Sequence, residues 1–583
     1  MWEPVKGNLL TRWSREVNPE QPLPEYPRPQ IKRKEWLNLN GLWDYSIRPK
    51  DEEMVDSYEG KILVPFPLES ALSGVSDRLK SNQRLWYHRK FSIPSQWKNK
   101  KILLHFGAVD WKTIIWINHQ KIGFHNGGYT PFSFDISDFV KYEGENSLVV
   151  AVWDPTDKEG QGRGKQVMDP NTIWYTAISG IWQTVWLEPV SNTYIKRIIA
   201  EPDVDNNLIR ISLETQNPHD IEEIYIEVRE EENVIFSVKE DTNKTFSISI
   251  PSPKLWSPQH PFLYDLIVTL NKGTTIIDRV ESYFGMRKIS LGEEQNGVRP
   301  ILLNNKRIFQ YGTLDQGYWP DGLYTAPTDS ALKYDIEITK EFGFNLIRKH
   351  VKVEPARWYY HCDKIGVLVW QDMPSGGDSF GTRNINDFKE TRKVSEQSDY
   401  YDELSEMIAM LFNHPSIIMW VPFNEGWGQF RTQYVCEKVR KLDPSRLINA
   451  ASGWFDFGVG DICDNHSYPN PFMPESTHIK SRAYVVGEFG GLSIEIENHT
   501  WKTKDKFGYR SYQERSKLMK KYSRLISRLK DLIVKGLSAA IYTQITDVEG
   551  EINGLLTYDR EVIKFNEKEL IELNKSVFQV QKD

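Results

Sequence analysis

The sequence of 583 residues lacks long hydrophobic runs, clustered cysteines and any excess of positive charge. No stretch approaches the roughly 18 consecutive apolar residues of a membrane-spanning helix, so we expect no membrane partner. A formal net charge of −7 provides no basic surface and argues against a nucleic-acid partner. The 3 cysteines are scattered, which suits neither a disulfide framework nor a zinc site. We therefore expect neither a metal nor a cofactor.

The N-terminal segment MWEPVKGNLLTRW does not have the pattern of a secretory signal, which is a basic start followed by an apolar core. The expectation from this segment is a cytoplasmic protein. The sequence leaves the oligomeric state open, including a homo-oligomer. Aromatic residues are plentiful, with 20 Trp and 27 Tyr, and such rings stack on sugars as well as fill cores.

Two β-rich regions come first along the chain, and at this length two to four domains are expected. Residues 1–190 contain short strand-like runs such as KILLHFGAV and SLVVAVWD, separated by turn residues and closed by GIWQTVWLEPV. This pattern predicts an N-terminal β-sandwich of the jelly-roll kind. Residues 191–285 continue with runs that alternate with period two, which predicts a second, immunoglobulin-like sandwich.

From residue 286 onwards, strand-like runs alternate with helix-like segments. Apolar residues recur at helical spacing in ALKYDIEITKEFG and in YDELSEMIAMLFNH. Eight strands can be counted: RIFQYGTLD, NLIRKH, VLVWQDM, SIIMWVPFNE, RLINAASGW, ICDNHSYP, YVVGEFGG and AAIYTQITD. Eight strand-helix units predict a C-terminal (β/α)8 TIM barrel over residues 286–583.

Two of these apolar strands deliver a glutamate at their C-terminal end. The segment SIIMWVPFNEGWGQ reaches Asn424 and Glu425 before the glycines Gly426 and Gly428, which allow close approach of other groups. The segment AYVVGEFGG reaches Glu488 in the same way. One buried glutamate is explained equally well as the partner of an arginine. The repetition of the design on a second strand favours catalysis.

Other strands also finish in polar residues, and their ends should meet on one face of the barrel. These residues are Asp315, Arg348 with His350, Asp372, His466 with Tyr468, and Gln544 with Asp547. Each has a structural alternative: an internal ion pair for Arg348, helix capping for Asp315 and Asp372, and a strand end before prolines for His466 and Tyr468. His350 is better placed than an isolated core histidine because it follows Arg348 at a strand end.

Two carboxylates in a deep site with several donors match the needs of glycosidic-bond cleavage. One acid protonates the leaving oxygen, and one carboxylate faces the anomeric carbon. No phosphate-binding loop or dinucleotide fingerprint competes with this interpretation.

With these motifs, the chain resembles glycoside hydrolase family 2, which includes β-galactosidases, β-glucuronidases and β-mannosidases. The domain order is shared, and GIWQTVWLE is similar to the family signature at the end of the first sandwich. The resemblance covers nearly the whole chain. It implies an exo-acting, retaining, two-step hydrolase with a carbohydrate substrate.

The resemblance also implies roles for individual residues. In the family the acid/base follows an asparagine at the end of the fourth barrel strand, which makes Glu425 the acid/base and Asn424 the partner of the sugar 2-hydroxyl. The nucleophile ends the seventh strand, which makes it Glu488. Arg348 and Tyr468 would donate hydrogen bonds to that nucleophile.

Further substrate-binding candidates lie around the same site. Trp427 would form part of its apolar wall. Family sandwiches send a loop to the active site, so Trp174 in the long irregular segment DPTDKEGQGRGKQVMDPNTIWYTAISG is a candidate. Arg163 and Lys165 in this loop either reach the sugar or lie in solvent.

The identity of the sugar is left open by departures from the family patterns. RKHVKVEP stands where many members have RxSHYP, which weakens the assignment as a β-galactosidase. The segment ENHTWKTK lacks the NxK spacing with which β-glucuronidases bind the sugar carboxylate, so a uronic acid is disfavoured. VWQDMP is similar to β-mannosidases. We still expect a β-galactosidase-like enzyme, because β-galactosidase is the commonest label in the family. An α-L-arabinofuranosidase or a β-mannosidase is the alternative. A carbohydrate-binding protein without catalysis is the alternative from another class.

Overall fold

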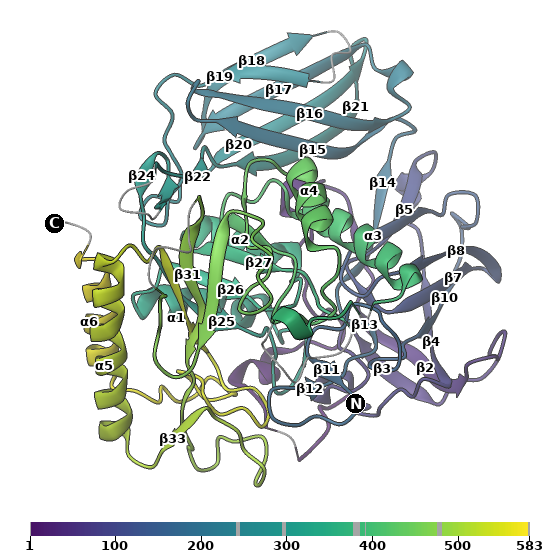
Figure 1. The fold of residues 1–583 in the computed structure, drawn as a ribbon. Coiled ribbons are helices and arrows are strands. Elements are labelled where there is room, and N and C mark those ends of the chain that lie inside the picture. The colour runs from purple at the N-terminus through teal and green to yellow at the C-terminus, as the bar shows by residue number, and fades with distance from the viewer. Residues whose placement is uncertain are drawn as a thin grey trace.

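The computed structural model describes residues 2–7, 9–240, 245–293, 299–376, 385–390, 392–474 and 481–580. Three β-containing domains pack around one another (Figure 1), with the immunoglobulin-like sheets at the top of the view. The N-terminal sandwich lies to the right, and the barrel occupies the centre and left. The predicted fold class is confirmed. Among the described residues, no helix combines the length and apolar character that a membrane crossing requires.

The first domain is a sandwich of a four-stranded and a six-stranded antiparallel sheet, with orders β1-β14-β5-β9 and β3-β2-β4-β10-β7-β8. Trp43, Tyr87 and Phe106 are fully buried in the core between the sheets. The strands are β1 (Leu37–Asn38), β2 (Gly41–Pro49), β3 (Gly60–Val64), β4 (Gln83–Phe91), β5 (Lys101–Phe106), β7 (Lys112–Ile117), β8 (Gln120–Asn126), β9 (Phe132–Asp135), β10 (Asn146–Trp153) and β14 (Val185–Val190).

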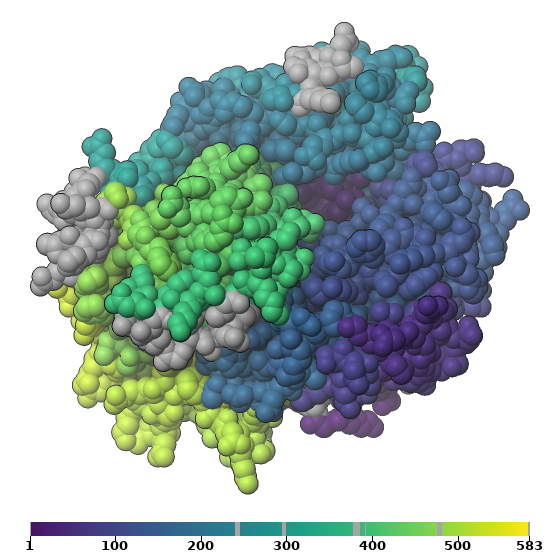
Figure 2. All heavy atoms as spheres, turned by 45° about the vertical axis from the view of Figure 1, so that its right-hand side comes forward, coloured from purple at the N-terminus to yellow at the C-terminus, as the bar shows by residue number. Residues whose placement is uncertain are grey.

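A long loop leaves this sandwich after β10 and returns before β14. Its only regular structure within the described residues is two short pairings: β11 (Gln166–Val167) with β12 (Tyr175–Thr176), and β13 (Gly180–Ile181) with β6 (Val109–Asp110). The loop packs on the barrel, since the hydroxyl of Tyr175 donates to Glu551 and the amide of Thr176 donates to Glu549 at 2.9 Å. Figure 2 shows the blue sandwich lying directly against the green part of the barrel.

The second domain has two antiparallel sheets, with orders β15-β16-β19 and β18-β17-β20-β21. Alternating residues of each strand are buried between these sheets, as in Ile209, Ile211 and Leu213 of one strand. The strands are β15 (Tyr194–Asp203), β16 (Leu208–Gln216), β17 (Glu223–Glu230), β18 (Asn233–Glu240), β19 (Thr245–Ser249), β20 (Tyr264–Lys272) and β21 (Thr275–Phe284). A small sheet of β22 (Ile289–Leu291), β23 (Ile301–Leu303) and β24 (Lys306–Arg307) leads into the barrel.

The third domain is a nearly closed barrel of eight parallel strands in the order β29-β28-β27-β26-β25-β34-β31-β30. All eight predicted strands are confirmed. They are β25 (Gln310–Asp315), β26 (Leu346–Lys349), β27 (Leu368–Asp372), β28 (Ile417–Val421), β29 (Leu447–Ile448), β30 (Ile462–Ser467), β31 (Ala483–Gly490) and β34 (Ala539–Thr543). The barrel is filled by apolar side chains such as Leu346, Trp370 and Met419.

Six helices cover the described part of the barrel: α1 (Asp329–Glu341), α2 (Ala356–Ile365), α3 (Val394–Leu411), α4 (Thr432–Leu442), α5 (Arg515–Val534) and α6 (Glu567–Val577). The two helices predicted from apolar spacing are confirmed as α1 and α3. The first is capped by Thr328, whose side chain accepts from the amide of Ala331. The prediction of eight complete strand-helix units is wrong at β29, because residues 449–461 run to β30 without a helix.

Candidate active site

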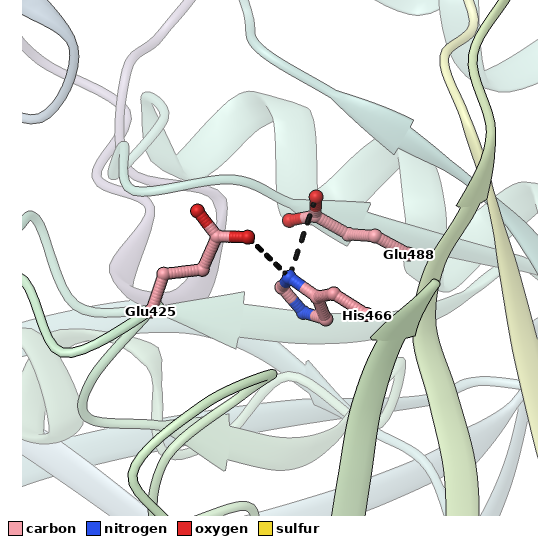
Figure 3. Close-up of side chains that lie close together, drawn as sticks. All are labelled: Glu425, His466 and Glu488. Carbon is pink, nitrogen blue, oxygen red and sulfur yellow. Dashed lines mark hydrogen bonds and ion pairs between the residues drawn. The ribbon is translucent and has the colours of Figure 1, made fainter. Parts of the chain in front are cut away.

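The carboxyl ends of the parallel strands bring the predicted glutamates together. Glu488 lies in β31, Glu425 follows β28 by four residues, and His466 lies between them in β30. Figure 3 shows both carboxylates turned towards the imidazole of His466. Its Nδ1 lies 2.8 Å from Oε1 of Glu425 and 3.5 Å from Oε2 of Glu488. One donor atom from each of the three residues lies within 4.8 Å of the other two.

The turn after β28 places Glu425 by an unusual backbone conformation. Glu425 has φ 48° and Gly426 has φ 77°, both in the left-handed region that residues other than glycine rarely adopt. Gly428, with φ 59°, also passes so close to the neighbouring chain that a Cβ atom there would lie 1.8 Å from the carbonyl oxygen of Gly376. The predicted need for close approach is thus confirmed at Gly428.

Glu488 is held in its ionised form. Arg348 Nη1 donates to Oε1 at 3.2 Å, and the hydroxyl of Tyr468 donates to Oε2 at 2.6 Å, so both predicted contacts are confirmed. Burial alone would raise the pKa of Glu488, but the positive charges of His466 and Arg348 lower it to about 2. A carboxylate with such a pKa is fully charged at neutral pH.

His466 is the counter-charge of this pair. Burial disfavours its protonation, yet the adjacent carboxylates of Glu488 and Glu425 raise the pKa of His466 above its usual range. Its other ring nitrogen, Nε2, lies 2.8 Å from the hydroxyl of Ser452. Ser452 in turn donates to Asp464 at 2.5 Å, which fixes the orientation of the ring.

Arg348 organises the adjacent strand ends. Its guanidinium forms two hydrogen bonds with Asp372, at 3.1 and 2.8 Å, and Nη2 donates to Oδ1 of Asn424 at 2.8 Å. His350 lies 2.9 Å from Asp372 through Nδ1. Burial and the nearby charge of Lys165 lower the pKa of His350 well below its usual range, so its ring is neutral. The amide nitrogen Nδ2 of Asn424 is buried and has no hydrogen-bond partner among the described residues.

Asp315 is placed differently from the other candidates. Its Oδ2 accepts from Lys349 at 2.6 Å and its Oδ1 accepts from the amide of Gly317 at 2.7 Å. Within the described residues it forms no hydrogen bond with either glutamate. Asp315 therefore belongs to an internal ion pair at the end of β25, and a contact with substrate stays a prediction.

The sandwich loop reaches the site, as the sequence suggested. The ring of Trp174 lies 4.9 Å from that of Trp427, between centroids, and Trp427 lies 6.2 Å from the ring of His350. Trp427 is 4% exposed, so it forms part of an apolar wall. Lys165 from the same loop is also buried and lies near these rings.

The sequence did not predict two residues that contact the site, Tyr509 and Ser452. Tyr509 stacks on Tyr468 with ring centroids 3.6 Å apart and an interplanar angle of 2°, and it is 38% exposed beside this partner of Glu488. Ser452 orients His466. Neither residue lies in a recognisable motif, so no local signal identified them.

The donor atoms of Glu425, His466 and Glu488 are also close enough to hold a cation, and they form the one such group among the described residues. The expectation that no metal is required stays a prediction.

A barrel that presents two glutamates from its fourth and seventh strands, bridged by a histidine, defines a site of the glycoside hydrolase class. The chain belongs to family 2 of the glycosyl hydrolases. Three models of this family match the chain: the family 2 sugar binding domain at residues 64–189, the glycosyl hydrolases family 2 model at residues 186–287, and the family 2 TIM barrel domain at residues 299–485.

Curated relatives carry two activities in their names. A β-galactosidase of Thermoanaerobacter pseudethanolicus is 28% identical over 378 residues, which are 62% of this chain and 47% of the relative. A β-glucuronidase of Bacteroides fragilis is 26% identical over 442 residues, 71% of this chain and 60% of the relative. The chain thus spans about half the length of such relatives. A solved β-D-glucuronidase of Dictyoglomus thermophilum has the same fold, with a TM-score of 0.74, 20% identity, and coverage of 95% of this chain and 98% of the other.

Proposed function

We propose that the protein is an exo-acting, retaining glycoside hydrolase, with Glu488 as nucleophile and Glu425 as acid/base. The observation that carries this proposal is the close approach of the two glutamates, whose oxygens lie within 4.8 Å of each other. Retaining enzymes separate their carboxyl groups by about 5 to 5.5 Å, whereas inverting enzymes leave about 6.5 to 9.5 Å for a water.

The contacts of Glu488 support its role as nucleophile. Glu488, ionised and fixed by Arg348 and Tyr468, attacks the anomeric carbon while the bond to the leaving oxygen breaks. Glu425 gives its proton to that oxygen. In the second step Glu425 takes a proton from water, the hydroxide bonds to the anomeric carbon, and the bond to Glu488 breaks. Retention of configuration follows from two inversions.

Asn424 binds the sugar 2-hydroxyl in this proposal. Arg348 anchors its carbonyl oxygen at 2.8 Å, which leaves the unpartnered Nδ2 as a buried donor of fixed direction. A buried donor without a partner costs free energy, so a sugar hydroxyl that accepts from it is favoured. Trp427 and Trp174 supply the flat apolar surface beside it.

The sugar is a terminal β-linked residue, for which β-galactoside and β-glucuronide are the candidates that the names of the relatives support. A β-mannoside or an α-L-arabinofuranoside is the alternative on the same scaffold. We also propose that the protein acts in the cytoplasm.

The test is turnover of 4-nitrophenyl glycosides, namely the β-D-galactoside, β-D-glucuronide, β-D-mannoside and α-L-arabinofuranoside, by wild type and by Glu488→Ala. We expect wild type alone to release nitrophenol, and proton NMR to show that the first product keeps the substrate's anomeric configuration. Inversion would refute the mechanism. Sugar binding by a folded protein that turns over none of the four would favour the non-catalytic alternative.

A further inference from the structure

Four lysine side chains are buried in the described part of the chain, and one of them differs from the rest. Each of the other three ends 2.6 to 3.0 Å from a carboxylate oxygen: Lys349 from Asp315, Lys352 from Glu354 and Lys564 from Asp547. Lys165 is 5% exposed, yet among the described residues no carboxylate forms an ion pair with it and its ammonium donates no hydrogen bond. The other three show that this chain normally supplies a carboxylate partner to a buried lysine, because an unpaired charge inside a protein is costly.

The ammonium of Lys165 faces the active site. It lies 6.0 Å from the ring centroid of Trp427 and 5.4 Å from that of Tyr175. After burial, its charge is the largest influence on the pKa of His350, and it also acts on Glu488. A negatively charged group of a bound substrate could therefore pair with this ammonium.

The backbone holds Lys165 in this position before any ligand arrives. Its carbonyl accepts from the amide of Tyr175 at 3.0 Å, and the amide of the preceding Gly164 donates to Ser375 at 2.9 Å. Gly164, with φ 57°, approaches the barrel so closely that a Cβ would lie 2.5 Å from the carbonyl oxygen of Val351. A cation fixed in this way is preorganised for a ligand.

We propose that Lys165 is the specificity-determining residue of this site and that it binds the carboxylate of a terminal uronic acid. The inference rests on the proposed function and names its substrate class. The segment after Glu488 lacks the NxK spacing, which argued against a uronic acid, but Lys165 supplies a cation from a different domain. A neutral sugar would give the ammonium no counter-charge, whereas a carboxylate completes the ion pair that the other buried lysines have.

The test compares matched sugars that differ only in charge. Wild type and Lys165→Met are assayed with 4-nitrophenyl β-D-glucuronide and β-D-galacturonide, and with the corresponding β-D-glucoside and β-D-galactoside. Lys158→Met is the control, because Lys158 lies in the same loop with its side chain 62% exposed. We expect wild type to prefer one uronide over its neutral twin. Lys165→Met should lower kcat/KM for that uronide by roughly 10- to 150-fold and change the neutral value little, since hydrogen bonds to charged groups are worth that much.

Two outcomes would overturn the inference while the proposed function stands: hydrolysis of neutral glycosides only, or equal losses on charged and neutral sugars in Lys165→Met. Equal losses with a shifted pH profile would make Lys165 a positioning residue for Glu488. Absence of turnover on every glycoside would defeat the proposed function instead. Quenching of tryptophan fluorescence by free glucuronic or galacturonic acid then tests Lys165 separately: binding lost in Lys165→Met but kept in Lys158→Met supports the inference, and no difference between the two refutes it.

Discussion

Replacement of Asn424 by alanine tests the proposed contact with the sugar 2-hydroxyl. In the structure Oδ1 of Asn424 accepts from Arg348 at 2.8 Å, and Nδ2 is buried without a partner. The substitution removes the amide donor to the oxygen of the sugar 2-hydroxyl. A hydrogen bond between neutral groups is worth about 0.5 to 1.5 kcal/mol, so kcat/KM should fall by roughly 2- to 13-fold.

A 2-deoxy glycoside separates this contact from damage to the site. Wild type should lose activity when the 2-hydroxyl is removed, and Asn424→Ala should lose little more, because the two changes delete opposite ends of one hydrogen bond. Initial rates with four combinations of enzyme and substrate give the coupling. If Asn424→Ala loses the same factor on the 2-deoxy sugar as on the full sugar, the 2-hydroxyl is not its partner.

Four further predictions follow from the same contacts. Glu425→Ala should slow substrates with poor leaving groups by about 10²- to 10⁴-fold, leave good leaving groups far less affected, and recover with azide; equal losses without rescue would remove the acid role. Because the folded-state pKa of Glu488 is lowered to about 2 from 4.5, its ionisation contributes stability above pH 4.5 that is lost as the pH falls towards 2. Chemical unfolding should therefore show about 3 kcal/mol more acid destabilisation in wild type than in Glu488→Gln over that window, and parallel profiles would contradict this. Gly428→Ala should destabilise the protein by more than 2 kcal/mol, about the upper range for a strained position, whereas Gly458→Ala, with φ 75° but open space around it, should cost about 1 kcal/mol; equal Tm shifts would argue against the contact with Gly376. EDTA should leave turnover unchanged, and a complete loss restored by a metal would make the three-residue group around Glu425 a metal site.

The fold was predictable because the spacing of apolar residues along the chain determines which segments form strands and helices. Each of the eight apolar runs after residue 286 became a barrel strand, since a strand buried on both faces must be apolar along its whole length. The two glutamates of the site were predictable for a related reason. A charged residue at the end of a buried strand needs an explanation, and two strands with the same design point to one shared site. The sequence of β29 did not show that no helix follows it. An irregular segment can connect two parallel strands as well as a helix can.

The electrostatics of the site were not accessible from the sequence. His466 gave only a weak local signal, yet it lies between both glutamates because β30 is adjacent to β31 in the barrel. Tyr509 comes from an irregular segment and reaches Tyr468 only through the folded loop. Among the described residues no carboxylate forms an ion pair with Lys165. This depends on which side chains the sandwich loop meets on another domain, and no spacing rule encodes it.

The central claim is that Glu488 forms a covalent bond with the sugar, and trapping of that intermediate tests it most directly. The protein would be treated with the 2,4-dinitrophenyl 2-deoxy-2-fluoro derivative of whichever glycoside it hydrolyses, digested, and its peptides analysed by mass spectrometry. We predict time-dependent inactivation and one fluorosugar attached to Glu488. An adduct on another residue, or continued turnover without any adduct and with inversion of configuration, would contradict the account.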